Sequence, residues 1–501
     1  MKFLNWTLSL ALTFGLLTGC APASSGSASA NTIPPETGST VTAGEATTIT
    51  FTDAAVTASN AAGLEIDGTA LTIDGAGTYL LTGQCADGSV KVQKGTTGVT
   101  LVLSGLDLTS QTTAPIVCGK SSQVTLVAAE GTENTLEDTE NNSDDSGSLD
   151  AENAVIKCKD GSQVTLQGGG TLNILAKGKN GIKSGATTAE EGEASLTIRE
   201  LTLIINAPIN DAINAEQTLN VESGTLTISA ADDAIHSDLV LNIGAEGTDG
   251  PTITVTACYE GLEAAQLTIC SGDIDITSSD DCLNAANSDL SGYDFTMTIS
   301  GGTITACSSS GDGFDSNGDL TITGGSGTVW TANTADNQPL DADGTITVSG
   351  GTVLAAGGSN GMGMNLTATQ PCLTFGSSGG MGGGPNSGSA ITKNAAFTVT
   401  DSDGNTIYSG SAVCNASFLF FSSPDLTDQA AYTLAAGTTS LTAETQSGTV
   451  SSGFGGMGGG PGNRGDFQPG DGQQPPEMPS DGQRPQMPSG QKPGGASSSQ
   501  S

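Results

Sequence analysis

The chain has 501 residues, and its 53 acidic side chains outnumber 14 basic ones to give a formal net charge of −39. This balance argues against nucleic acid and anionic membrane surfaces as partners, because both bind proteins through clusters of Lys and Arg. It also predicts that a polyanionic ligand would have to be bound through a cation.

The chain begins with a pattern typical of an export signal, which we assign to residues 1–19. A charged start is followed by an apolar run from Leu8 to Leu17, which is too short to span a bilayer as a helix. Small residues then precede Cys20 and resemble the bacterial lipobox. Lipidation of Cys20 would hold the protein on the extracellular face of the bacterial cell membrane through its lipid alone. The alternative is a plain cleaved signal with a chance cysteine.

Residues 20–45 are rich in Ala, Ser, Thr, Gly and Pro, a composition typical of a flexible tether. From Ile49 the pattern changes to short alternating runs such as Val99–Leu103 and Val124–Val127, which predict strands. These runs are less regular than the later ones, as expected for the terminal units of a repeat protein. A polar excursion is expected from Glu133 to Glu152.

The stretch from Asn210 to Val348 contains the most regular repeat of the chain. Each unit has a polar turn that closes on an apolar residue, and short alternating runs rich in Thr, Ile, Val and Leu follow it. The units recur at intervals of about 20 to 30 residues, which is typical of a solenoid. The six turns are Asn210–Ile213, Asp232–Ile235, Tyr259–Leu262, Asp280–Leu283, Gly311–Phe314 and Asn337–Leu340.

The content of each unit predicts the kind of repeat. No stretch of this region shows an apolar i, i+3, i+4, i+7 pattern long enough for a helix, and propeller blades of about 40 residues would be too long for the interval. An all-β fold remains, in which each unit is one coil of a single-stranded parallel β-helix and equivalent residues stack from coil to coil. We assign residues 46–375 to this domain.

Three segments complete the chain. Residues 376–388 are a low-complexity, Gly-rich loop, and residues 389–445 are a β-rich segment. The aromatic run Phe418–Phe421 suits a C-terminal cap that closes the open end of the stack. Residues 446–501 consist mainly of Gly, Pro, Met, Gln and Ser with few β-branched residues, so we expect this tail to be disordered.

Nine cysteines beyond Cys20 are irregularly spaced and include no C-x-x-C pair. The odd number argues against a disulfide framework, and the missing pair argues against a zinc site. We therefore expect small, buried side chains.

Alignment of the units on the closing apolar residue places acidic and amide side chains in columns. The columns lie three and two residues before that residue, and one and three residues after it. Equivalent positions in adjacent coils lie about 4.8 Å apart, so stacked carboxylates would repel one another unless they were protonated or bridged. The ten aspartates expected to bind metal are Asp211, Asp232, Asp233, Asp238, Asp280, Asp281, Asp312, Asp315, Asp341 and Asp343.

A hard cation would relieve this repulsion, and Ca²⁺ is the predicted cofactor. Ca²⁺ takes about 6 to 8 oxygen ligands, which Asp, Asn and turn carbonyls of neighbouring coils can supply, whereas Mg²⁺ requires a tighter octahedral geometry. The alternative is that Asp and Asn are present only as good turn residues whose side chains cap the backbone.

Several phrases within residues 49–434 resemble a known family. They are the Gly-Thr-Leu-Thr-Ile strand at 224–228, the Asp-Asp-Ala-Ile turn at 232–235, the Asp-Gly-Phe turn at 312–314 and the run from Phe418 to Leu426. This pattern is similar to the bacterial calcium-containing, carbohydrate-binding β-helix family related in shape to pectate lyases. The resemblance implies a right-handed parallel β-helix, bound Ca²⁺, and adhesion to plant polysaccharides such as polygalacturonate or cellulose. The sequence departs from the family pattern at Glu260, at the Pro339 turn and in the insertion from 376.

The residues favour binding over catalysis. A polysaccharide lyase pairs Ca²⁺ with a Lys or Arg base, and no Lys or Arg occurs between Glu200 and Thr392. Basic residues that could reach the columns from outside this stretch are Lys177, Lys179, Lys183 and Arg199. A glycoside hydrolase needs two carboxylates, which the turns could supply, but polygalacturonases also present basic residues to the substrate. His236, the one histidine, fits a column member better than a general base.

We therefore predict no catalytic residue and a non-catalytic, calcium-dependent polysaccharide binder at the bacterial cell surface. The alternatives are a polysaccharide lyase or glycoside hydrolase on the same fold, and a structural cell-envelope adhesin with protein partners. The carbohydrate-binding residues and the oligomeric state do not follow from the sequence.

Overall fold

The computed structural model describes residues 46–332, 337–357, 364–376 and 391–451. The expected export signal, Cys20, the tether and most of the Gly-rich loop and the tail lie outside these residues. All described residues belong to one compact unit, Met1–Gly455, and the second unit, Gly456–Ser501, contains none of them.

The described residues are all-β, which confirms the predicted class. They form strands β1 to β38 and one turn of 3₁₀-helix at Asp144–Ser146, with no α-helix among them. The expected polar excursion from Glu133 to Glu152 is shorter than predicted, because Glu133–Asp138 form strand β10 of the coils. The 3₁₀ turn lies within the remainder, where the Ser143 side chain accepts a hydrogen bond from the Asp145 N–H. Nowhere in the described part of the chain is there a helix long and apolar enough to cross a membrane.

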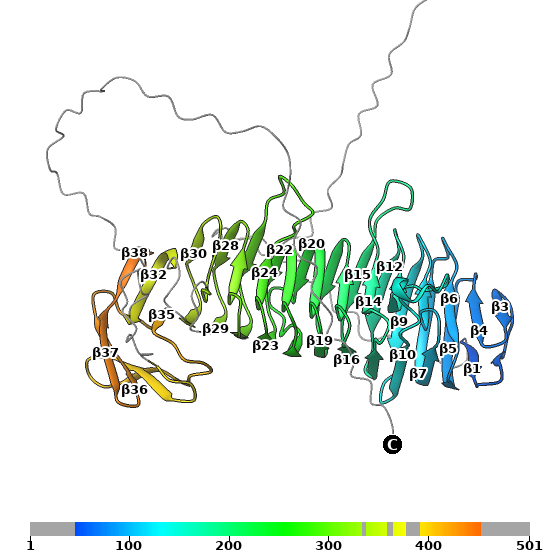
Figure 1. The fold of residues 1–501 in the computed structure, drawn as a ribbon, viewed down its shortest axis with the longest axis horizontal. Coiled ribbons are helices and arrows are strands. Elements are labelled where there is room, and N and C mark those ends of the chain that lie inside the picture. The colour runs from blue at the N-terminus through cyan, green and yellow to red at the C-terminus, as the bar shows by residue number, and fades with distance from the viewer. Residues whose placement is uncertain (1–45, 333–336, 358–363, 377–390, 452–501) are drawn as a thin grey trace, which may run out of the picture. The chain divides into compact units, whose positions relative to one another are not determined.

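Most strands belong to three series, and within each series a strand pairs in parallel with the equivalent strand of the next coil (Figure 1). The first series, which follows the polar turns, contains β4 (Ala70–Ile73), β6 (Ser89–Val92), β8 (Ile116–Cys118), β11 (Ala154–Cys158), β14 (Asn180–Ser184), β17 (Ile213–Ala215), β20 (Ile235–Ile243), β22 (Leu262–Ile269), β24 (Leu283–Ala285) and β27 (Phe314–Ser316).

The second series continues each coil beyond the first and shares the long strands β20 and β22 with it. Its other members are the first half of β7 (Val99–Ser110), which pairs with β9, and then β9 (Gln123–Ala128), β12 (Gln163–Gln167), β15 (Ser195–Ile198), β18 (Thr218–Val221), β25 (Thr296–Ile299), β28 (Asp319–Ile322), β30 (Ile346–Val348) and β32 (Asn365–Gly376).

The third series leads back to the next polar turn. It contains β7 (Val99–Ser110), β10 (Glu133–Asp138), β13 (Thr171–Leu175), β16 (Thr202–Ala207), β19 (Thr225–Ala230), β21 (Thr252–Ala257), β23 (Asp273–Ser278), β26 (Thr303–Ser308), β29 (Ser326–Thr331) and β31 (Thr352–Gly357). At the start of the unit, β5 (Gly77–Cys85) pairs in parallel with β1 (Thr47–Phe51) and with β7, while β2 (Val56–Ala58) and β3 (Leu64–Asp67) pair antiparallel with β1 and β4.

Alternation in the sequence explains this arrangement. In β19 the residues Leu226, Ile228 and Ala230 are buried, whereas Thr227 and Ser229 between them are only partly buried. Inward residues of successive coils stack into one continuous apolar core. Eight cysteines are free, and six of these are buried, as expected for small side chains of the interior.

Glycines at the start of third-series strands permit a sharp corner. Gly302 has a φ of 82° and Gly351 a φ of 75°, in the left-handed region that favours glycine. A Cβ on Gly302 would also lie 2.9 Å from the carbonyl oxygen of Gly272 in the previous coil. The corner therefore requires glycine both for its backbone conformation and for the close approach of the neighbouring coil.

The C-terminal segment is built differently from the coils. A four-stranded antiparallel sheet contains β33 (Ala396–Thr400), β34 (Thr406–Ser411), β36 (Ala431–Ala436) and β37 (Thr439–Glu444). Strand β35 (Phe418–Ser422) pairs antiparallel with β31 and β32, and β38 (Gln446–Ser451) with β32. The prediction of a disordered tail from residue 446 was therefore wrong for its first six residues, which backbone pairing with β32 holds in a strand. A second apolar cluster, which includes Trp330, Phe397 and Phe421, joins this sheet to the last coils.

Candidate functional site

The closing apolar residues of the polar turns form one straight column across the first series. Ile213 lies in register with Ile235, Leu262 with Leu283, and Leu283 with Phe314. The residues one position later are therefore also in register, in the order Asn214, His236, Glu263, Asn284 and Asp315. The alignment made from the sequence thus places these residues on one edge of the coils.

The column two residues before the closing residue is held together by the main chain. The N–H of Ala212 donates to the carbonyl of Asp233 at 2.9 Å, and the N–H of Ala234 donates to the carbonyl of Glu260 at 3.0 Å. The same pattern continues from Gly261 to Asp281 and from Cys282 to Asp312. Each acidic residue of this column therefore lies directly beside the equivalent residue of the next coil.

One oxygen of several carboxylates also caps the backbone of the following turn. Asp281 Oδ1 accepts from the N–H of Asp312 at 2.6 Å, and Asp312 Oδ1 accepts from the N–H of Gln338 at 2.5 Å. Asp211 Oδ1 accepts a longer bond, 3.3 Å, from the N–H of Asp233. The turn-capping role expected of Asp is thus real, and at Asp281 and Asp312 it occupies one of the two carboxylate oxygens.

Three groups of side chains along this edge bring their ligand atoms within 4.8 Å of one another. The groups are Asp211 with Asp232 and Asp233, Asp233 with His236 and Glu263, and Asp312 with Asp315 and Asp341. Two of the three consist only of aspartates predicted from the sequence. The middle group contains a histidine and therefore behaves differently.

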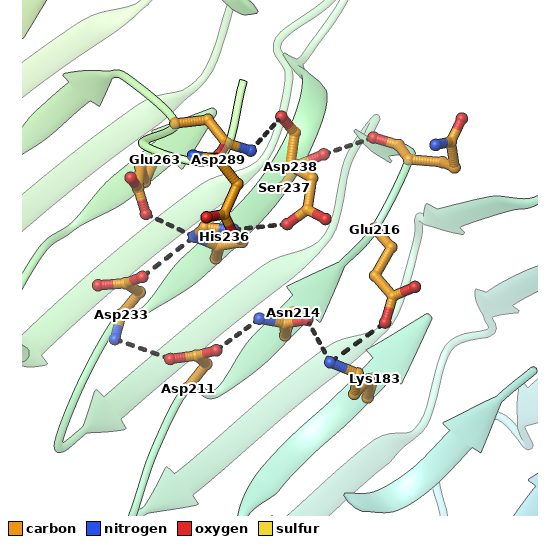
Figure 2. Close-up of polar contacts among 12 residues, drawn as sticks. Lys183, Asp211, Asn214, Glu216, Asp233, His236, Ser237, Asp238, Glu263 and Asp289 are labelled. Carbon is orange, nitrogen blue, oxygen red and sulfur yellow. Dashed lines mark hydrogen bonds and ion pairs between the residues drawn. The ribbon is translucent and has the colours of Figure 1, made fainter. Parts of the chain in front are cut away.

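His236 lies between three acidic side chains and provides a positive charge that neutralises part of theirs (Figure 2). Its Nδ1 lies 3.1 Å from Asp233 Oδ2 and 2.5 Å from Glu263 Oε2, and its Nε2 lies 2.9 Å from Asp238 Oδ1. Burial by itself would lower the pKa of His236, but these three carboxylates raise it to about 12. The imidazolium neutralises part of this group, so the group has less need of a metal ion.

Lys183 neutralises the first coil of the acidic edge in a similar way. Its Nζ donates to Asn214 Oδ1 at 3.2 Å and lies 3.3 Å from Glu216 Oε1. Asn214 Nδ2 in turn donates to Asp211 Oδ2 at 2.6 Å (Figure 2). Burial and the nearby carboxylate of Asp233 raise the pKa of Asp211 to about 6.

In the coils beyond His236, the acidic side chains have no cationic partner among the residues that the structure describes. Burial, with a contribution from Asp281, raises the pKa of Asp312 to about 7, and burial with Asp315 raises that of Asp281 to about 7. Burial and Asp341 raise the pKa of Asp315 to about 6, and burial and Glu263 raise that of Glu260 to about 8. A bound cation would favour the ionised form of these carboxylates.

Two buried amide oxygens in the same coils support this conclusion. Asn284 is in register with Asp315, and Gln338 follows Asp312 in the column two residues before the closing residue. Asn284 Oδ1 and Gln338 Oε1 are buried and have no hydrogen-bond partner among the described residues. Asn284 Nδ2 is occupied, because it donates to Glu260 Oε2 at 2.8 Å. A buried oxygen without a donor is costly, and a bound cation would provide its partner.

The donor set of these coils fits a hard cation. It consists of carboxylate and amide oxygens from successive turns, which are the ligands that Ca²⁺ prefers. The residues that could hold the ion are Asp281, Asn284, Asp312, Asp315, Gln338 and Asp341.

The other predicted metal ligands have different surroundings. Asp238 bonds to His236, and Asp280 accepts a hydrogen bond from the Tyr259 hydroxyl, which raises the pKa of that tyrosine to about 12. Asp343 is exposed and adds to the negative field at Asp315 and Asp341. None of these three lies in an aspartate-only group of the described residues.

The predicted metal ligands omitted four side chains at this edge, although the alignment of the sequence had already placed three of them, Glu260, Glu263 and Asn284, in the columns. Glu260, Glu263, Asn284 and Gln338 occupy the same columns as the predicted aspartates. Their position in the repeat could have identified them as candidate metal ligands, because any side chain with an oxygen atom in these columns could bind the ion. Restricting the set to aspartate excluded them.

The fold and this edge define an all-β protein that presents rows of carboxylate and amide oxygens on stacked parallel coils. Residues 67–361, which include every group described above, match the family of carbohydrate-binding domain-containing proteins, and the chain belongs to this family.

One curated relative and one solved structure are similar to the chain. A carbohydrate-binding domain-containing protein of Acetivibrio thermocellus is 31% identical over 135 residues, which cover 27% of this chain and 46% of the relative. The chain thus spans about half the length of that relative. The structure of the polysaccharide lyase-like protein from C. thermocellum, a gadolinium derivative, has a TM-score of 0.36 and 20% identity over 60% of this chain and 95% of that one.

Proposed function

We propose that this chain is a non-catalytic, calcium-dependent polysaccharide-binding protein of the bacterial cell surface. The observation that carries the proposal is the edge from Asp281 to Asp341, where carboxylates with raised pKa values and unpartnered amide oxygens meet without a fixed cation. Membership of the carbohydrate-binding domain-containing family makes a glycan the ligand of choice. Plant cell-wall glycans such as polygalacturonate or cellulose are the expected class.

The scaffold in this proposal is a right-handed parallel β-helix. Parallel pairing in three series, with equivalent residues in register over many coils, supports a helical winding of the chain. The right-handed sense comes from the family resemblance and from the general preference for right-handed crossovers between parallel strands. Such a scaffold repeats its outward side chains at about 4.8 Å, which suits a linear polymer lying along it.

Calcium would be held by Asp281, Asp312, Asp315 and Asp341 together with the amide oxygens of Asn284 and Gln338. When bound, Ca²⁺ neutralises the carboxylates and can take hydroxyl or carboxylate oxygens of a sugar as further ligands. The protein side chains position these oxygens, because the backbone bonds from Asp312 and Gln338 to the preceding carboxylates hold the turns in place.

The proposal assigns no catalysis to this edge. A β-elimination requires a base beside the metal, and the chain from Glu200 to Thr392 contains no Lys or Arg. His236 bonds to three carboxylates, so it is not free to accept a proton from a substrate. Release of unsaturated or reducing-end products from pectin would overturn this part of the proposal.

Surface location forms part of the same proposal. Cys20 lies outside the described residues, and its lipidation rests on the lipobox-like run before it. A lipid at Cys20 would leave the coils free to bind a glycan outside the cell. A structural adhesin for protein partners would have the same anchor, but it would bind no glycan with or without calcium.

Affinity electrophoresis tests the proposal. The protein is run in native gels that contain polygalacturonate or hydroxyethyl cellulose, with calcium or with EDTA, and mobilities are normalised to gels without glycan. We expect retardation in calcium that EDTA abolishes and that excess calcium restores. Asp312→Asn combined with Asp315→Asn should remove the retardation, whereas Asp273→Asn, an exposed residue of β23 on another face, should not.

Retention that survives EDTA and the double substitution would contradict calcium dependence. An absence of retention on every glycan, with and without calcium, would contradict polysaccharide binding and favour the adhesin.

A further inference from the structure

The column that carries His236 and Asp315 continues toward the N-terminal coils with lysines. Lys183 is in register with Asn214 on one side and with Lys157 on the other, and Lys157 is in register with Val117. Two ammonium groups thus occupy adjacent coils on the edge that is acidic further along. In a chain with a net charge of −39, this pair is an unusual concentration of positive charge.

Lys157 has no partner for its ammonium group. Lys183 is paired with Glu216 and Asn214, and the nearby Lys159 is paired with Glu152 at 2.6 Å. No hydrogen bond or ion pair of Lys157 exists among the described residues, although Glu216 and Glu152 contribute to its field. Burial and the like charge of Lys183 lower the pKa of Lys157.

Such an arrangement is unfavourable unless an anion joins the two lysines. Partial burial removes water from the Lys157 ammonium group, and the neighbouring ammonium repels its charge. The rest of the chain offers many carboxylates that could have paired with it, yet Glu216 satisfies only Lys183. An external carboxylate or sulfate would receive charge-assisted hydrogen bonds from both groups.

We propose that Lys157 and Lys183 form an anion subsite that binds a carboxylate or sulfate group of an acidic polysaccharide. This inference rests on the proposed polysaccharide binding and makes it specific for charged glycans. Lys183 lies in register with Asn214, which donates to Asp211, so the subsite adjoins the acidic edge. One acidic chain could contact fixed cations at the lysines and bound cations at the aspartates.

The subsite explains how a strongly acidic protein could bind an acidic polymer. Long-range repulsion opposes the approach of a polyanion, and a local pair of cations lowers the barrier where the polymer first makes contact. The two lysines are separated from the Asp281 to Asp341 edge by several coils, so both contacts require a polymer and not a single sugar. Neutral glycans would gain nothing from the lysines.

The test compares full-length wild type with Lys157→Met, Lys183→Met and Lys157→Arg in calcium-containing gels. The gels contain polygalacturonate, dextran sulfate, dextran or hydroxyethyl cellulose, which separates carboxylate, sulfate and neutral ligands. Each Lys→Met substitution should weaken binding to the preferred acidic glycan about 10-fold and should leave neutral-glycan binding unchanged. Lys157→Arg should keep most of the affinity, and Lys393→Met, an exposed lysine of the C-terminal segment, should behave as wild type.

Equal affinity of both Met variants and wild type for the acidic glycans would overturn the subsite. An equal loss on neutral and acidic glycans would overturn it as well, because it would indicate a general defect. Thermal unfolding reports folding, and Lys183→Met keeps the test valid if Lys157→Met is unstable. Wild-type binding to neutral glycans alone would retain the proposed function and reject the subsite, whereas no binding to any glycan would reject both.

Discussion

At the scale of single residues, two kinds of positive charge divide the acidic edge. Lys183 and His236 neutralise the coils that contain Asp211 and Asp233 through direct contacts. The coils with Asp312 and Asp315 have no such contact among the described residues. The same turn sequence therefore produces an internally neutralised part and a part that depends on a cation, and the difference arises from one or two side chains.

The raised pKa values predict how the stability of calcium-free protein depends on pH. Asp312 has a pKa of about 7 in the folded protein against 3.8 for the free side chain, so the folded state binds more protons than the unfolded state between these values. The free energy of unfolding should therefore fall as pH rises from about 4 to 7. Thermal melts in EDTA at pH 5 and pH 8 should give the lower melting temperature at pH 8.

Calcium should reduce this loss, because the ion replaces the protons on the same carboxylates. The double variant Asp281→Asn with Asp312→Asn should show a weaker pH dependence in EDTA than wild type. A melting temperature in EDTA that rises between pH 5 and pH 8, or an unchanged slope in the double variant, would contradict the assignment.

At the scale of elements, the corners between strands determine whether the columns stay aligned. Several third-series strands, among them β26 and β31, directly follow glycines with positive φ, where the neighbouring coil leaves no room for a side chain. A one-residue shift of such a corner would turn the whole following strand over, since side chains alternate across it. The Asp and Asn columns therefore depend on glycines that lie on another face of the coil.

Gly302→Ala tests this dependence. Alanine at a φ of 82° is strained, and its Cβ would lie 2.9 Å from the carbonyl oxygen of Gly272. We expect a loss of about 1 to 3 kcal/mol in the free energy of unfolding. The matched control is Gly327→Ala in the interior of β29, where the nearest atom to a new Cβ is 3.9 Å away.

The control should be neutral or slightly stabilising, because alanine has less conformational entropy to lose than glycine. Denaturant unfolding of both variants in the presence of calcium measures the difference. Equal destabilisation by the two substitutions would show that the corner at Gly302 does not require glycine.

At the scale of the whole molecule, negative charge is the dominant property. The chain has 53 acidic and 14 basic side chains, so its negative charges repel one another in the folded state. Salt should weaken this repulsion by screening. Screening acts on every exposed charge, whereas calcium should act mainly on the acidic edge. The two effects can be separated by matching ionic strength.

We expect calcium chloride at millimolar concentration to raise the melting temperature more than sodium chloride of equal ionic strength. An ion that binds only the folded state stabilises it by mass action, in addition to any screening. Magnesium should give a smaller rise in melting temperature, because Mg²⁺ requires a stricter octahedral arrangement of its oxygen ligands than Ca²⁺ does. Identical rises with calcium and sodium would mean that the edge holds no specific site.

The sequence alone was sufficient to predict the all-β class and the register of the column one residue after each turn. Alternation of apolar and polar residues sets which side chains face inward, and the recurring turn sets which residues are equivalent in successive coils. The register pairs Ile213 with Ile235 and Leu283 with Phe314 as the alignment of the turns requires. Backbone hydrogen bonding between parallel coils enforces this register, so a local pattern was sufficient to predict it.

Only the tertiary structure decided which charges meet. It directs Asp238 to His236 and Asn214 to Asp211. Within the described part of the chain it also leaves Lys157 and the amide oxygens of Asn284 and Gln338 without a hydrogen-bond partner. These contacts depend on side-chain rotamers, on burial and on the neighbouring coil, none of which is encoded in the spacing of the repeat. The spacing of the repeat in the sequence predicts which residues share a column. Which side chains bond to one another within and between the columns depends on the folded structure.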